Sequence, residues 1–232
     1  MEKSGKIMRV AAIIFMGLTA AMNVLGGAGT SCAAFSSSVA YRMAFKAILD
    51  YRWLYQGLVV TTVLIGLVGI WATVKLVRGG PTVYRSALIV LIIGTILGGV
   101  QFYASMTLRG KATPANVKFF INVFTLLYFL LLKAPGIRDK VDFSTPGNDI
   151  AEKAAMAGMA AIVAGIVVLT VFTWAGPSHT FYGENWVYVF YTPLMVSGTL
   201  LILAGVSALL WAAREVFHQE VNQAGLELSE GK

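Results

Sequence analysis

Residues 84–106 read YRSALIVLIIGTILGGVQFYASM, a stretch with one charged residue, Arg85, near its beginning. A hydrocarbon core about 30 Å thick is crossed by about 20 helical residues. The segment is therefore long and apolar enough to span a membrane as a helix. It lacks the strict polar and apolar alternation that a barrel strand would show.

Five further blocks of this character follow the same rule, and the composition agrees with them. The chain is 57% hydrophobic and 12% charged, whereas an ordinary soluble domain carries about 25% charged residues. We therefore predict an all-α integral membrane protein, a single transmembrane domain over residues 1–232. Its six spans are expected at residues 7–27, 53–77, 84–106, 114–132, 151–174 and 186–216.

The segment GGAGTSCAAF, residues 26–35, contains the only cysteine, Cys32. Its glycines predict that the first helix ends here and stays uncleaved, because its apolar run is longer than that of a signal peptide. With no cysteine partner and no basic residue closer than Arg42, Cys32 is expected to be a small buried side chain.

The first outer loop, residues 28–52, is predicted to form a short amphipathic helix lying in the interface. It begins at a serine cap near Ser38, and its basic and apolar residues separate onto different faces. Either it closes the mouth of the bundle, or it forms a lid or a docking surface for a partner.

The basic residues predict orientation, because cytoplasmic loops are enriched in Lys and Arg. Twelve fall on one side: Lys3, Lys6, Arg9, Lys75, Arg78, Arg85, Lys133, Arg138, Lys140, Lys153, Arg214 and Lys232. Six fall on the other: Arg42, Lys46, Arg52, Arg109, Lys111 and Lys118. We expect an integral protein of a bacterial-type inner or plasma membrane with both termini cytoplasmic. The net charge of +7 then reflects membrane flanks and not a nucleic-acid partner.

Catalytic chemistry finds little support in the sequence. None of the 11 acidic residues falls in the middle of a span, and the lack of intramembrane charge argues against an ion-coupled carrier. His179 and His218 lie at opposite ends of the bilayer, which excludes a haem held by two histidines. No catalytic residue, metal site or cofactor is predicted.

Three groups of residues are candidates for a site or an interface. The outer loop between the last two spans carries His179, Tyr182 and Glu184, which form either a polar cluster or a turn in the headgroup region. The amides of Asn23, Gln101 and Asn122 are expected to face the bundle interior. They either hold helices together or line a small site for a quinone, a lipid head or a neutral solute.

Small residues and one proline mark the shape of the bundle. Pro193 is predicted to bend the last span. Small residues four apart allow close helix packing at Gly94, Gly98, Ala157, Ala161 and Gly165.

These features favour a non-catalytic multi-pass protein, a structural or accessory subunit of a larger membrane complex. Its expected partners are the lipid bilayer and other membrane subunits or further copies of itself. One alternative is a small permease for a neutral or lipophilic solute. The other is an enzyme or electron-transfer anchor that binds lipid or quinone.

Overall fold

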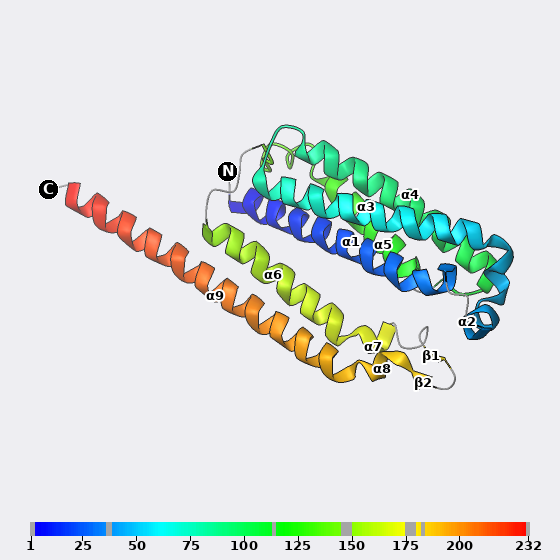
Figure 1. The fold of residues 1–232 in the computed structure, drawn as a ribbon. Coiled ribbons are helices and arrows are strands. Elements are labelled where there is room, and N and C mark those ends of the chain that lie inside the picture. Colours follow the sequence, from blue (N-terminus) through cyan, green and yellow to red (C-terminus); the bar gives the residue numbers. More distant parts are fainter. Residues whose placement is uncertain are drawn as a thin grey trace. The chain divides into compact units, whose positions relative to one another are not determined.

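A computed structural model describes residues 3–35, 39–112, 115–144, 150–174, 180–181 and 184–230 (Figure 1). Apart from one pair of two-residue strands, the regular elements of the described chain are helices, joined by turns. By their internal contacts the residues form two compact units, unit 1 (Met1–Pro146) and unit 2 (Gly147–Lys232). The elements of unit 1 are α1 (Lys3–Phe35), α2 (Val39–Ala44), the 3₁₀ helix η1 (Lys46–Tyr51), α3 (Arg52–Arg78), α4 (Val83–Arg109) and α5 (Ala115–Leu131). Those of unit 2 are α6 (Ile150–Leu169), α7 (Val171–Trp174), β1 (Thr180–Phe181), β2 (Glu184–Asn185), α8 (Trp186–Val189) and α9 (Tyr191–Glu230).

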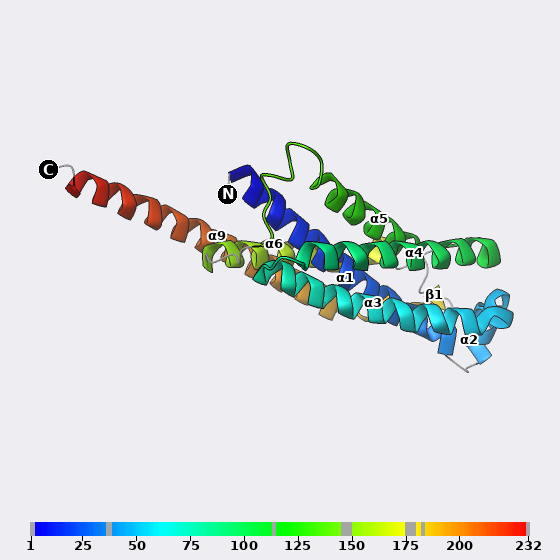
Figure 2. The same cartoon turned by 90° about the horizontal axis from the view of Figure 1, so that it is seen from above.

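Unit 1 is a bundle of four long helices that lie side by side in both views (Figures 1 and 2). Helix α1 packs against α3 and α5, and α4 packs against the same two helices. Left-handed glycines end two of the helices, Gly79 (φ 76°) after α3 and Gly110 (φ 65°) after α4. Such a conformation is accessible to glycine without steric penalty.

Glycines also bring α1 and α3 close together. A Cβ atom added at Gly66 would lie 2.8 Å from the Val24 backbone nitrogen, and one at Gly69 would lie 2.9 Å from the Ala20 Cβ. Only a residue without a side chain fits at these crossings, so the glycines set the distance between the two helices.

Helix α1 does not end at the predicted position. It continues through the glycine-rich segment to Phe35. An added Cβ at Gly27 would lie 2.6 Å from Val63 Cγ2, so this glycine serves a helix contact and not a turn. The true end is capped from α3, where Arg52 donates from Nε to the Ala34 carbonyl at 2.7 Å and from Nη2 to the Phe35 carbonyl at 2.8 Å. The Cys32 side chain lies outside the described residues.

The predicted amphipathic helix of the first outer loop is two short pieces, α2 and η1. Ser38, its predicted cap, lies outside the described residues. Ile48 is 1% exposed and packs with Ala34 and Tyr55 in an apolar cluster that fastens η1 to the ends of α1 and α3.

Four described helices are long and apolar enough to cross a membrane: Ser4–Phe35, Lys46–Arg78, Val83–Arg109 and Tyr191–Glu215. Two apolar helices are shorter, Ala115–Leu131 and Lys153–Leu169. Length and composition therefore fit a membrane protein. The count of six spans and the single domain stay predictions.

Unit 2 is built on the antiparallel pair α6 and α9, which share a second glycine contact. An added Cβ at Gly158 would lie 2.7 Å from the Gly205 carbonyl oxygen, and one at Gly165 would lie 2.7 Å from that of Gly198. These glycines repeat every seven residues on each helix, so two matched pairs bring the backbones together. At the other end of the unit, β1 pairs with β2 in antiparallel register.

The last predicted span, residues 186–216, is divided in the structure. The short α8 ends at Val189 and α9 starts again at Tyr191. Pro193 lies in the first turn of α9, where an N–H group has no acceptor within the helix, so the proline interrupts no hydrogen bond of α9.

Candidate functional site

A seam of buried polar side chains runs through the interior of unit 1. On α1 it includes Thr19 and Asn23, and on α5 the residues at positions i, i+4 and i+7 of one helix face. Each member is 2% exposed or less. The polar seam comprises Thr19, Asn23, Thr62, Gln101, Lys118, Asn122 and Thr125.

The two asparagines form a reciprocal pair between α1 and α5. Asn23 Nδ2 donates to Asn122 Oδ1 at 3.3 Å, and Asn122 Nδ2 donates to Asn23 Oδ1 at 3.0 Å. Asn122 Nδ2 also donates to the Lys118 carbonyl at 2.8 Å within its own helix. One turn further along, the hydroxyls of Thr19 and Thr125 share a hydrogen bond of 2.7 Å.

Lys118 is the ionisable member of the seam. Its Nζ donates to Gln101 Oε1 of α4 and, at 3.3 Å, to Thr62 Oγ1 of α3. Its aliphatic stem passes Gly26 of α1, where an added Cβ would lie 3.3 Å from Lys118 Cδ. Through one side chain α5 thus reaches the three other long helices of the bundle. Within the described residues Lys118 contacts no carboxylate.

The position of Lys118 corrects the expectation that the spans contain no charge. Thr62 lies ten residues inside α3 and Gln101 eight residues before the end of α4, about 15 and 12 Å from those ends at 1.5 Å per residue. Lys118, predicted to flank the membrane, is therefore an interior residue. Arg9, counted on the opposite side, is also buried, at 3% exposed. Arg9 still donates to the Leu76 carbonyl, two residues before the end of α3. Only the count that held Lys118 therefore falls, from six to five, so the predicted orientation keeps its direction and stays a prediction.

Of the predicted interior amides, Asn23 and Asn122 are brought together. Gln101 of α4 accepts a hydrogen bond from Lys118, which lies one helical turn before Asn122 on α5. Three buried side-chain atoms of the described residues have no hydrogen-bond partner: Ser4 Oγ, Arg9 Nε and Thr95 Oγ1. None belongs to the seam. Its polar groups are satisfied by one another, as burial in an apolar interior requires.

Two of the predicted packing glycines lie against α5. A Cβ at Gly94 would meet Asn122 Oδ1, and a Cβ at Gly98 would lie 3.3 Å from the Phe119 Cα. In unit 2, Gly165 is in the contact with α9, Ala161 is half-buried between Gly158 and Gly165, and Ala157 is exposed.

The predicted outer-loop cluster is not part of the described structure. His179 and Tyr182 lie outside the described residues, as does the side chain of Glu184, so the cluster stays a prediction. Among the residues that are described, no three His, Cys, Asp or Glu side chains come together as a metal ion would require.

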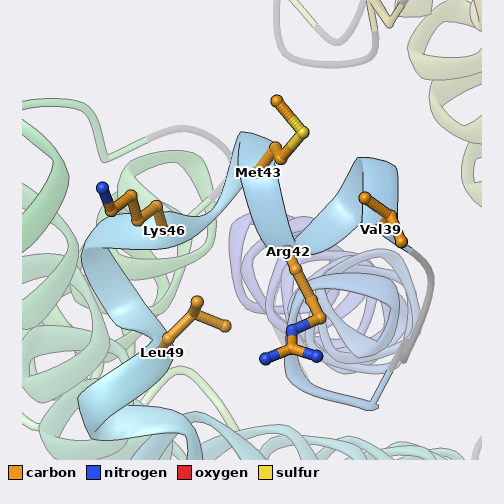
Figure 3. Close-up of a pocket in the computed structure, with 5 residues that line it drawn as sticks. All are labelled: Val39, Arg42, Met43, Lys46 and Leu49. Atoms are coloured by element: carbon orange, nitrogen blue, oxygen red, sulfur yellow. The ribbon is translucent and has the colours of Figure 1, made fainter.

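A surface groove lies at the end of unit 1 where α2 turns into η1 (Figure 3). Its volume is about 380 Å³, and its lining residues are Val39, Arg42, Met43, Lys46 and Leu49. Two cations and three apolar side chains therefore surround one hollow.

No protein-family model, curated protein or solved structure matches the chain. The function must therefore be inferred from the geometry. Sequence reasoning identified the three amides of the seam but missed Lys118, which was counted as a membrane-flanking cation at the start of the span 114–132. The available signal was its spacing, since Lys118, Asn122 and Thr125 recur at the interval of one helix face.

Proposed function

We propose that the chain is a non-catalytic integral membrane protein that acts as a helix-packing subunit of a larger membrane assembly. The observation that carries this proposal is the internal pairing of the polar seam. Its amides, hydroxyls and lysine amine, the groups that would otherwise bind a solute, are engaged with one another.

The close approach of the helices supports the same interpretation. An added Cβ at Gly26 would meet the Lys118 stem and one at Gly94 would meet the Asn122 amide, so these glycines bring the helices close to the polar groups. Interhelical hydrogen bonds and small residues are what hold helices together in lipid. A permease that opened along this seam would have to separate the pairs Asn23–Asn122 and Thr19–Thr125.

The proposed partner interface is on unit 2. One face of α6 is occupied by α9, and the exposed Ala157 and Ala160 lie on other faces of the helix. On α9, Leu200 and Leu203 are 59% and 58% exposed. Lipid contacts such leucines readily, whereas exposed small residues on a membrane helix allow a further helix to pack closely.

The test is native mass determination after gentle extraction of the full chain from its own membrane. The wild-type chain is expected to leave the membrane bound to another subunit or to further copies of itself. Replacing both exposed alanines, A157L/A160L, should release the chain as a monomer because the leucines block close approach. L203A is the matched control, since it changes a lipid-facing side chain, and it should retain the partner.

Two results would overturn the proposal. The first is a lone wild-type chain under several mild detergents and in native lipid discs. The second is an equal loss of partner in L203A and in A157L/A160L, which would mean that general destabilisation and not a small-residue interface explains the release.

A further inference from the structure

The groove between α2 and η1 is fixed in place by contacts outside it. Ile48 is buried beneath η1, and the Phe45 ring lies 5.1 Å from the Arg109 guanidinium carbon of α4. Gln56 Nε2 donates to the Ala34 carbonyl at 3.2 Å, beside the bonds from Arg52. The η1 side of the groove is therefore held by α1, α3 and α4, and α2 packs against α1 and η1.

The lining itself is open to the surroundings. Val39 is 73% exposed and Met43 is 75% exposed, and Arg42 and Lys46 are exposed as well. Figure 3 shows the five side chains arranged around the turn that joins α2 to η1. Among the described residues, those that line the groove include two cations and no acid. In the part of the chain that the structure describes, apolar and cationic side chains thus line the same hollow.

The place of the groove in the fold indicates its depth in the membrane. It adjoins Phe35, the last residue of α1, and Arg52, the first residue of α3. Where those helices leave the hydrocarbon, the groove lies at the depth of the lipid headgroups. In the described residues this end of unit 1 carries one acid, Asp50, against a cluster of cations. Those cations are Arg42, Lys46, Arg52, Arg109 and Lys111.

We propose that this groove binds the headgroup of an anionic phospholipid. Arg42 and Lys46, whose side chains extend in different directions in Figure 3, turn toward the phosphate when it binds, and Val39, Met43 and Leu49 pack against the glycerol and the first part of an acyl chain. The volume is at the lower end of the 300–1,000 Å³ typical of ligand sites, which suits a headgroup and not a whole lipid. Free phosphate would use the two cations but would leave the exposed apolar residues unexplained. Paired basic and apolar side chains at the interface are the usual means of holding anionic lipid.

The inference rests on the membrane placement in the proposed function and not on a partner subunit. A monomeric chain that binds lipid in the groove would overturn the subunit proposal and leave this one standing.

The experiment uses the full chain in lipid discs that contain phosphatidylglycerol with a photoreactive group near the phosphate. Adducts are mapped by mass spectrometry. We expect adducts within residues 39–49 that survive an excess of inorganic phosphate. The double variant R42Q/K46Q should bind roughly 30-fold more weakly, because each basic residue near an anionic surface contributes about fivefold. R42K/K46R, which keeps both charges, should label within about twofold of the wild type, on the scale of a single such contribution.

K111Q is the matched control, since it removes one exposed cation at the same end but outside the groove. Its adducts should still fall within residues 39–49, and its labelling should fall by no more than about fivefold, the contribution of a single surface cation. Because the altered side chains are exposed, elution and melting of all variants should match the wild type. Labelling unchanged in R42Q/K46Q, adducts outside residues 39–49, or an equal yield from a zwitterionic phosphatidylcholine probe would overturn the proposal. Loss of labelling in inorganic phosphate would overturn the assignment to lipid.

Discussion

The Asn23–Asn122 pair allows the packing role of the seam to be measured as an interaction energy. Each asparagine loses two amide hydrogen bonds when its partner becomes alanine, because the bonds of 3.3 and 3.0 Å are reciprocal. Interhelical hydrogen bonds in membranes average about 0.6 kcal/mol and reach about 1.7 kcal/mol. Two such bonds predict a coupling of about 1–3 kcal/mol between the two positions.

The single changes should differ in size. Asn122→Ala removes the pair and also the bond of 2.8 Å to the Lys118 carbonyl, so it should destabilise the protein more than Asn23→Ala. Once either partner is gone, the remaining amide is buried without its bonds, a penalty of about 1–3 kcal/mol. The double variant N23A/N122A should therefore be less unstable than the sum of the two single variants.

The assay is equilibrium unfolding in dodecyl sulfate mixed micelles, followed by circular dichroism for the wild type, both single variants and the double variant. Thr170→Ala combined with Asn23→Ala is the control, because the exposed Thr170 bonds only within its own helix segment. That control pair should be additive within about 0.5 kcal/mol. Additivity of the same quality for Asn23 and Asn122 would refute the reasoning, because the pair would then contribute nothing to the packing of α1 against α5.

Three further predictions concern single positions and use the same unfolding assay unless another is named. Lys118→Met keeps the stem but leaves the buried Gln101 Oε1 and Thr62 Oγ1 without their donor, so it should lose about 1–3 kcal/mol. Lys118→Ala should lose about 2–5 kcal/mol because it also empties the space of the stem. Gly165→Ala places a Cβ 2.6 Å from Ile202 Cγ1 and should destabilise the protein by about 1–3 kcal/mol. Gly57→Ala is the control, because an added Cβ there has no atom within 4 Å, and it should be neutral or stabilising. Equal effects of the two changes would contradict the glycine contact. Arg52→Gln removes the guanidinium from the last carbonyls of α1. Amide hydrogen exchange at the end of that helix should become about tenfold faster, the equivalent of about 1.4 kcal/mol. Unchanged exchange there would mean that Arg52 does not stabilise the end of α1.

The apolar helices were predictable because lipid leaves a simple signal. A run such as residues 84–106 needs only its length and composition to be recognised, and α4 extends from Val83 to Arg109, close to the expected bounds. Local patterns of this kind depend on no residue elsewhere in the chain.

The glycine-rich end of α1 was misread because a glycine has two uses. Its freedom predicts a turn, but Gly26 and Gly27 instead make room for Lys118 and Val63. The contacting residues lie on α5 and α3, far along the chain, so nothing within residues 26–35 reveals which use applies.

The predictions for Lys118 and for the packing face of α6 depended on contacts with distant parts of the chain in the same way. A lysine near the start of a short span resembles a flanking charge until α3 and α4 place Thr62 and Gln101 beside it. Helix α6 has small residues on most of its faces, so spacing alone did not identify Gly158 as the residue that contacts α9. The neighbouring Ala157, which was predicted to pack, is exposed in the structure.

The central claim, that this chain packs within a larger membrane assembly, is tested most directly by the native mass of the particle that leaves its own membrane under gentle extraction. The account predicts a mass greater than that of one chain with its bound lipid, and a return to the mass of one chain in A157L/A160L but not in L203A. A wild-type particle that contains a single chain under every mild condition would contradict it.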